Sequence, residues 1–152
     1  MIILEGPNGC GKSSLAERLA RQFDWPLVKY PTPKDPRDAV KNFDAALTLP
    51  DNAILDRHPL ISDRIYAPIM FPGIDPIPWQ PEVLSGHVLV YCRVPLGTAI
   101  HRHKYQKGDP FYRNEMRVFA EYDALFSSIE HLRFDWTTDT ESELVKLIKG
   151  LI

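Results

Sequence analysis

Apolar positions along the chain follow two alternating patterns: short continuous runs, and longer stretches in which apolar residues recur every three or four positions. Short runs rich in β-branched residues are typical of buried strands, and the spaced pattern is typical of helices with one buried face. The runs predict strands at residues 1–5, 26–30, 53–56, 87–93 and 132–136. The spaced stretches predict helices at residues 13–23, 37–49, 60–70, 96–106, 111–129 and 141–151.

Strands and helices therefore alternate along the whole sequence. This order predicts an α/β protein with a largely parallel sheet of about five strands and helices on both faces, a three-layer sandwich. Two proline-rich segments, residues 31–36 and 71–81, show no periodicity and are predicted loops. Loops of this kind commonly shape the ligand crevice of an α/β sheet. No internal repeat divides the sequence, so we expect one domain over residues 1–152.

Composition and charge narrow the class of protein. The 152 residues carry a net charge of −2, which gives no reason to expect a nucleic-acid partner or an anionic membrane surface. No apolar run is long enough to cross a bilayer, and the start MIILEG lacks the features of a signal peptide. The two cysteines, Cys10 and Cys92, form no recognisable disulfide framework. We therefore expect a cytoplasmic protein, and a homodimer remains open.

The stretch GPNGCGKS, residues 6–13, lies between the first predicted strand and the first predicted helix and matches the pattern G-x-x-x-x-G-K-[ST]. Its glycines let the backbone fold into a concave nest whose N–H groups point at a polyphosphate. The helix that follows adds unsatisfied N–H groups at its start. In this pattern Lys12 reaches the β- and γ-phosphates, and Ser13 places its hydroxyl on Mg²⁺. The residues expected to contact ATP are Gly6, Asn8, Gly9, Cys10, Gly11, Lys12, Ser13 and Ser14.

A second group of polar residues follows the third predicted strand, in the stretch ILDRHPLISDRIY. Asp56 ends that strand, at the sheet edge where ligands bind in α/β folds. A carboxylate there can hold Mg²⁺ or accept a proton from an attacking group. The neighbouring Arg57 can bind a phosphate through two hydrogen bonds. His58 is a candidate substrate contact, and Tyr66 could stack on a base.

Basic residues gather around the interruption KGDP, within residues 101–114. Phosphoryl transfer spreads negative charge over the transferred group, so positioned cations are its main catalytic device. A short lid here would carry cations inward and exclude water, a competing acceptor. We expect Arg102 and Arg113 to be the lid cations.

The order of these motifs resembles the thymidylate kinase branch of the P-loop kinases, and especially its compact bacteriophage relatives. The similar segments are EGPNGCGKSSL, LVKYPTP, ILDRHPLIS, VYCRVPLGTAI and MRVFAEYDAL, which together span most of the chain. The resemblance implies transfer of the γ-phosphoryl group of ATP, with Mg²⁺, to a small (deoxy)nucleoside monophosphate.

The resemblance also implies roles for individual residues. Lys12 and the loop amides would hold the ATP phosphates, and Ser13 would bind the metal. Asp56 and Arg57 would orient the metal and the acceptor phosphate. Asn8 would contact the acceptor near its sugar, and the segment containing Tyr30 would border it.

Departures from the family pattern leave the acceptor open. Asn8 replaces the commoner aspartate, Arg93 stands where an aspartate often precedes Val-Pro, and Ser62 lies one residue further from the Asp-Arg pair. The stretch LDRHPLISDRIY is also similar to a motif of deoxynucleoside kinases, in which the acidic residue is the base. The alternatives are therefore a deoxynucleoside 5′-hydroxyl kinase or a non-kinase P-loop nucleotide-binding module. The mild acidity of the chain disfavours a polynucleotide end kinase.

Overall fold

A five-stranded parallel sheet forms the centre of the molecule in the computed structural model, which describes residues 1–102 and 114–152. The strands are β1 (Ile2–Glu5), β2 (Leu27–Lys29), β3 (Ile54–Asp56), β4 (Val88–Cys92) and β5 (Leu132–Phe134). Their order across the sheet is β2-β3-β1-β4-β5, and every neighbouring pair is parallel. Both the strand number and the parallel arrangement predicted from the sequence are confirmed.

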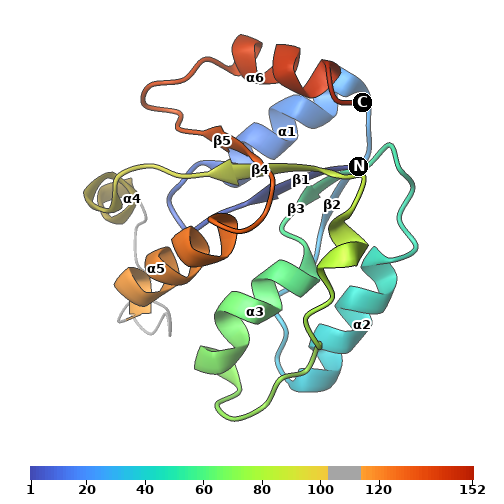
Figure 1. The fold of residues 1–152 in the computed structure, drawn as a ribbon, viewed down its shortest axis with the longest axis vertical. Helices are drawn as coiled ribbons and strands as arrows, with labels where there is room; N and C mark the ends of the chain where they lie inside the picture. The colour runs from blue at the N-terminus through green and yellow to red at the C-terminus, as the bar shows by residue number, and fades with distance from the viewer. Residues whose placement is uncertain (103–113) are drawn as a thin grey trace.

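Helices cover both faces of this sheet, as predicted. They are α1 (Lys12–Phe23), α2 (Pro36–Ala46), α3 (Pro59–Met70), α4 (Leu96–Arg102), α5 (Glu115–Phe126) and α6 (Glu141–Lys149). Figure 1 shows α1 and α6 on one face and α2, α3 and α5 on the other, while α4 lies beyond the end of β4. A short 3₁₀ helix, η1 (Pro81–Leu84), ends the second proline-rich loop.

Each face of the sheet has its own apolar core, because successive strand residues point to opposite sides. On β1, Ile3 packs with residues of α2, α3 and α5, whereas Ile2 and Leu4 pack with residues of α1 and α6. All three side chains are fully buried. The central strand is thus fixed from both sides, and the loop that follows it starts from a rigid position.

Several helix ends differ from the predicted ones by a few residues. Helix α3 begins at Pro59, because the ring of His58 accepts a hydrogen bond from the N–H of Leu60 and caps the helix. Helix α5 ends at Phe126, where Ser127 and Ser128 direct their hydroxyls at carbonyls of the last turn. Such side-chain bonds compete with continuation of a helix.

Two further predictions from the sequence concern the lid and the absence of a membrane-spanning segment. Nearly all of the predicted lid, residues 101–114, lies outside the described residues, and so does Arg113. Within residues 1–102 and 114–152, no helix has the length and apolar character needed to span a membrane.

Candidate active site

The loop between β1 and α1 turns sharply through three glycines with positive φ angles, Gly6 at 140°, Gly9 at 78° and Gly11 at 82°. Two of them also sit against neighbouring backbone. A Cβ on Gly6 would lie 2.2 Å from the Cys92 carbonyl oxygen, and one on Gly9 would lie 2.3 Å from that of Ala99. Only glycine fits these positions, so the loop has the compact shape expected of a phosphate-binding nest.

Lys12 begins α1 and turns its side chain back over the loop. Its ammonium group donates a 3.0 Å hydrogen bond to the carbonyl oxygen of Pro7, and the residue is only 6% exposed. Burial lowers the Lys12 pKa to about 8, with the nearby Arg57 charge acting in the same direction. Cys10 and Ser14 are also expected to contact ATP, and of these Cys10 is buried and Ser14 is exposed. The cation is therefore confined to the loop.

Ser13 and Asp56 meet although 43 residues separate them. The Ser13 hydroxyl donates a 2.6 Å hydrogen bond to the Asp56 carboxylate, which joins the first turn of α1 to the end of β3. Lys29, at the end of β2, lies 3.5 Å from the same carboxylate. The structure thus brings together the two motifs that the sequence analysis singled out separately.

Asp56 and Ser13 are also the residues that fit a magnesium ion. Carboxylate and hydroxyl oxygens are hard ligands of the kind Mg²⁺ prefers, and the ion is usually bound by one or two carboxylates together with substrate phosphates. Among residues 1–102 and 114–152, no group of three or more His, Cys, Asp or Glu side chains is arranged to hold a metal alone. This pair therefore suits an ion that arrives with a nucleotide.

Arg57 follows Asp56 and points its guanidinium group back toward the glycine-rich loop. One nitrogen donates to the hydroxyls of Tyr66 at 3.0 Å and Tyr122 at 2.7 Å. The other donates to the side-chain oxygen of Asn8 at 2.8 Å. Within the described part of the chain, no carboxylate lies at ion-pair distance from Arg57. Neutral groups therefore hold this cation in place, and its charge is not cancelled by direct contact.

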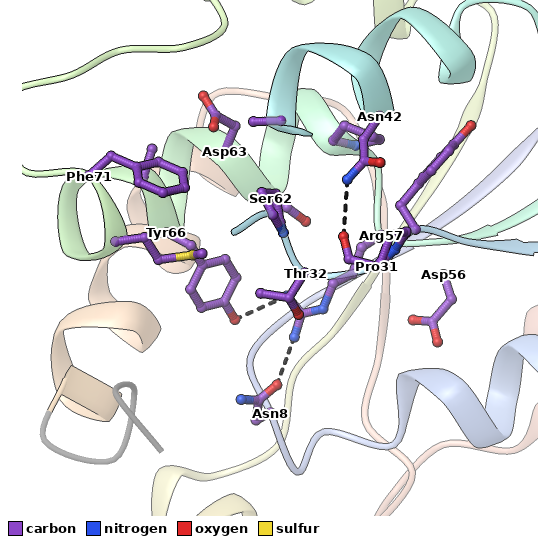
Figure 2. A pocket seen from close by; sticks show the side chains of 16 residues that line it. Asn8, Pro31, Thr32, Asn42, Asp56, Arg57, Ser62, Asp63, Tyr66 and Phe71 are labelled. Carbon is purple, nitrogen blue, oxygen red and sulfur yellow. Dashed lines mark hydrogen bonds between the residues drawn. The ribbon is translucent and has the colours of Figure 1, made fainter. Parts of the chain in front are cut away.

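A pocket of about 330 Å³ opens beside Arg57, between the segment after β2 and helices α2 and α3. Figure 2 shows Asn8, Arg57 and Asp56 on one side of it and Phe71 on the other. The side near the glycine-rich loop is polar, and the far side combines the Phe71 ring with the carboxylate of Asp63. A ligand with an anionic end and a flat end matches this division.

The pocket also collects other predicted substrate contacts. Tyr30 and Tyr66 both line it, as does Asn42, whose side-chain amide donates a 3.0 Å hydrogen bond to the Pro31 carbonyl (Figure 2). This hydrogen bond fixes the orientation of the Asn42 amide. The Asn42 side-chain oxygen can then accept a hydrogen bond from a ligand.

His58 lies elsewhere. It is 1% exposed, caps α3, packs edge-on against Phe43 and is not part of the pocket wall. Burial lowers the pKa of His58 to about 4, so the ring is neutral at pH 7. The placement argues against the predicted substrate contact, and we omit His58 from the proposed site.

Arg102 ends α4 and lies beside the glycine-rich loop rather than against the pocket. Its guanidinium carbon is 4.6 Å from the centre of the Trp136 ring, and both side chains border Gly11. Trp136 is 38% exposed. The pair presents a flat cationic and aromatic surface next to the loop.

Substitution of Gly9 tests the close approach of the loop to α4. Alanine at this position would need a positive φ and would collide with the Ala99 carbonyl, so the loop must move. We expect Gly9→Ala to lower stability by about 1–3 kcal/mol and to weaken ATP binding. Thermal unfolding and equilibrium ATP titration measure both effects.

Gly97 provides a matched control within α4. A Cβ there meets nothing within 4 Å, and its φ is ordinary. Gly97→Ala should therefore keep ATP affinity and leave stability equal or higher, since alanine is the better helix former. Equal behaviour of the two variants would show that the loop does not depend on this contact.

The sequence analysis missed residues that the structure places at or behind the site. Lys29 approaches Asp56, Trp136 borders the loop, and Glu5 and Tyr122 are fully buried behind Arg57. One signal for Glu5 was available, because a charged residue at the end of an apolar strand is rarely buried without a specific partner.

The fold has close counterparts among solved structures. A YorR protein from Bacillus subtilis, solved in complex with phosphorylated GDP, is 21% identical with a TM-score of 0.69, and the alignment covers 99% of this chain and 94% of that one. A deoxyadenosine kinase from M. mycoides with bound dCTP is 17% identical with a TM-score of 0.67, covering 99% and 98%. A shikimate kinase from Aquifex aeolicus is 15% identical with a TM-score of 0.60, covering 99% and 94%.

Sequence comparison alone gives no such relationship. The chain matches no protein-family model, and no curated protein sequence is significantly similar to it. At the identities of the structural neighbours, the likeness establishes the architecture and not the substrate. The chain therefore has the three-layer α/β fold of the P-loop kinases.

Proposed function

We propose that the protein transfers the γ-phosphoryl group of ATP to a small (deoxy)nucleoside monophosphate, as thymidylate kinase-like enzymes do. The observation that carries this proposal is the state of Arg57. It lies in the wall of the pocket, beside the glycine-rich loop, and its three hydrogen-bond acceptors are neutral. A guanidinium held this way favours an anionic acceptor and can bind its phosphate through two hydrogen bonds.

The chain's own groups supply the binding and positioning that such a transfer needs. The loop amides and Lys12 would hold the ATP phosphates, and Arg57 would hold the acceptor phosphate on the same side of the sheet. Ser13 and Asp56 would hold Mg²⁺, which supplies neutralisation of phosphate charge when bound. In this reaction class, catalysis consists mainly of such positioning and charge stabilisation.

The acceptor base and the adenine of ATP would bind in different surroundings. The acceptor base would occupy the far side of the pocket, near Phe71 and Asp63. The adenine of ATP would lie against Trp136 and Arg102, because a flat aromatic and a guanidinium both stack on a base. The lid role predicted for Arg102 and Arg113 remains part of this proposal.

A nucleoside kinase is the second candidate, and one observation favours it. Asp56 lines the same pocket, so its carboxylate could accept a proton from a 5′-hydroxyl. The deoxyadenosine kinase among the structural neighbours is in line with this reading. The two candidates share ATP and Mg²⁺ and differ in whether the acceptor already carries a phosphate.

A single panel separates the candidates. The protein would be incubated with Mg-ATP and separate nucleosides, nucleoside monophosphates or DNA ends, and the products resolved by chromatography. We expect at least one monophosphate to be converted to its diphosphate and the nucleosides to remain unchanged. Phosphorylation of nucleosides alone would establish the second candidate. Slow ATP hydrolysis that no acceptor accelerates would indicate a nucleotide-binding module.

A further inference from the structure

The backbone at Arg57 adopts an unusual conformation that β1 holds in place. Its φ angle is 77°, in the left-handed region that residues other than glycine rarely adopt. The N–H of Arg57 donates to the carbonyl oxygen of Leu4 at 3.0 Å, and the N–H of His58 donates to the Glu5 carboxylate at 2.6 Å. The last two residues of β1 thus fix a turn that would otherwise relax.

The same carboxylate also reaches the Arg57 side chain through one intermediate. The Tyr122 hydroxyl donates its hydrogen to the second oxygen of Glu5 at 3.0 Å. Because that hydrogen is committed, the Tyr122 oxygen faces Arg57 as an acceptor, at 2.7 Å. Glu5 therefore acts on Arg57 twice, through the backbone and through Tyr122.

Neither Glu5 nor Tyr122 can touch a ligand directly. Both side chains are 0% exposed, and neither lines the pocket. Burial raises the pKa of Glu5 to about 7, although the Arg57 charge and the hydrogen bonds oppose this shift. Burial of a carboxyl group lowers the stability of the fold, and such groups are concentrated at functional sites. This favours a functional role for Glu5 in addition to packing.

We propose that Glu5 and Tyr122 are positioning residues that aim the Arg57 guanidinium at the acceptor phosphate. This inference rests on the proposed function, because the acceptor phosphate is its target. The arrangement also connects three elements, since Glu5 directly precedes the glycine-rich loop, Arg57 follows β3, and Tyr122 belongs to α5.

The test is Tyr122→Phe, with Tyr91→Phe as its control. Both substitutions remove one hydroxyl and keep a ring, and the two rings are stacked with centres 6.1 Å apart. The Tyr91 hydroxyl donates to Asp123 and has no bond to Arg57. We expect Tyr122→Phe to raise the KM for the acceptor monophosphate about tenfold, the size of one charged hydrogen bond. The KM for ATP should change less than twofold in both variants.

A change in the acceptor KM without a change in the ATP KM distinguishes a positioning role from a general loss of structure. Weakened packing would alter both KM values, the melting temperature, or both, and would affect the two variants alike. Glu5→Gln is the second variant, because its amide would donate to Tyr122 and compete with Arg57. It should raise the acceptor KM as Tyr122→Phe does. An unchanged acceptor KM in Tyr122→Phe, or an equal change in Tyr91→Phe, would overturn the inference.

Failure of the proposed function would give a different result. If the wild-type protein converts no monophosphate, the function is wrong, and crystal structures of the two phenylalanine variants still decide the positioning. The inference requires the Arg57–Asn8 hydrogen bond to be lost in Tyr122→Phe and kept in Tyr91→Phe. Retention of that bond in both variants would overturn it.

Discussion

Lys12→Ala is expected to abolish phosphoryl transfer while leaving the fold intact. The Lys12 ammonium is the cation held within the phosphate-binding loop, where negative charge develops during transfer. We expect kcat to fall by about a thousandfold or more, within the range seen when a positioned cation is removed. Measuring product formation from Mg-ATP and the best acceptor at saturation gives this number.

Removal of the Lys12 charge should abolish transfer without lowering the stability of the fold. Because burial lowers the Lys12 pKa from its ordinary 10.5 to about 8, the folded protein pays to keep this side chain charged. That penalty is full below pH 8 and disappears as the pH rises toward 10.5. At pH 7, Lys12→Met, which keeps the aliphatic chain, should therefore melt at the wild-type temperature or above it.

Circular dichroism and thermal melts of both Lys12 variants provide the control. A native spectrum with lost transfer assigns the loss to chemistry. Retained turnover in Lys12→Ala would mean that the catalytic site lies elsewhere. A large fall in melting temperature in Lys12→Met would contradict the destabilising burial of the charge.

Local patterns in the sequence predict most of the fold. The apolar runs at residues 1–5 and 87–93 identify central strands because both faces of those strands are buried. The alternation with helices then fixes the three layers. The glycine-rich loop is equally local, since its mechanism depends on the identity of eight consecutive residues.

Long-range contacts explain what the sequence could not predict. Tyr122 lies within the predicted helix at residues 111–129, and its side chain is fully buried in the structure. Its hydroxyl, however, bonds Glu5 across 117 residues and Arg57 across 65. His58 shows the reverse case, because a polar residue beside Arg57 suggests a ligand contact, whereas its ring accepts a hydrogen bond at the start of the next helix. Periodicity gives the face on which a residue lies but not its hydrogen-bond partner.

Asp56→Asn is the second substitution with a large expected effect. The Asp56 carboxylate accepts the Ser13 hydroxyl and lies near Lys29, and asparagine preserves its shape while removing its charge. We expect kcat to fall by about a hundredfold or more, because the pair that would hold Mg²⁺ loses its only carboxylate. ATP affinity measured without Mg²⁺ should be unchanged, and the enhancement of that affinity by Mg²⁺ should shrink.

This substitution also decides between the two candidate acceptors. A phosphate has a second pKa near 6, so a monophosphate acceptor at pH 8 is already deprotonated and needs no base. Loss of Asp56 then acts through the metal, and raised Mg²⁺ concentrations should restore part of kcat with the pH profile unchanged. A nucleoside hydroxyl must lose its proton, so loss of a base would remove the acidic limb of the pH profile, and Mg²⁺ would restore nothing. The second result would replace the monophosphate proposal with the nucleoside one, whereas near-wild-type kcat would remove Asp56 from both.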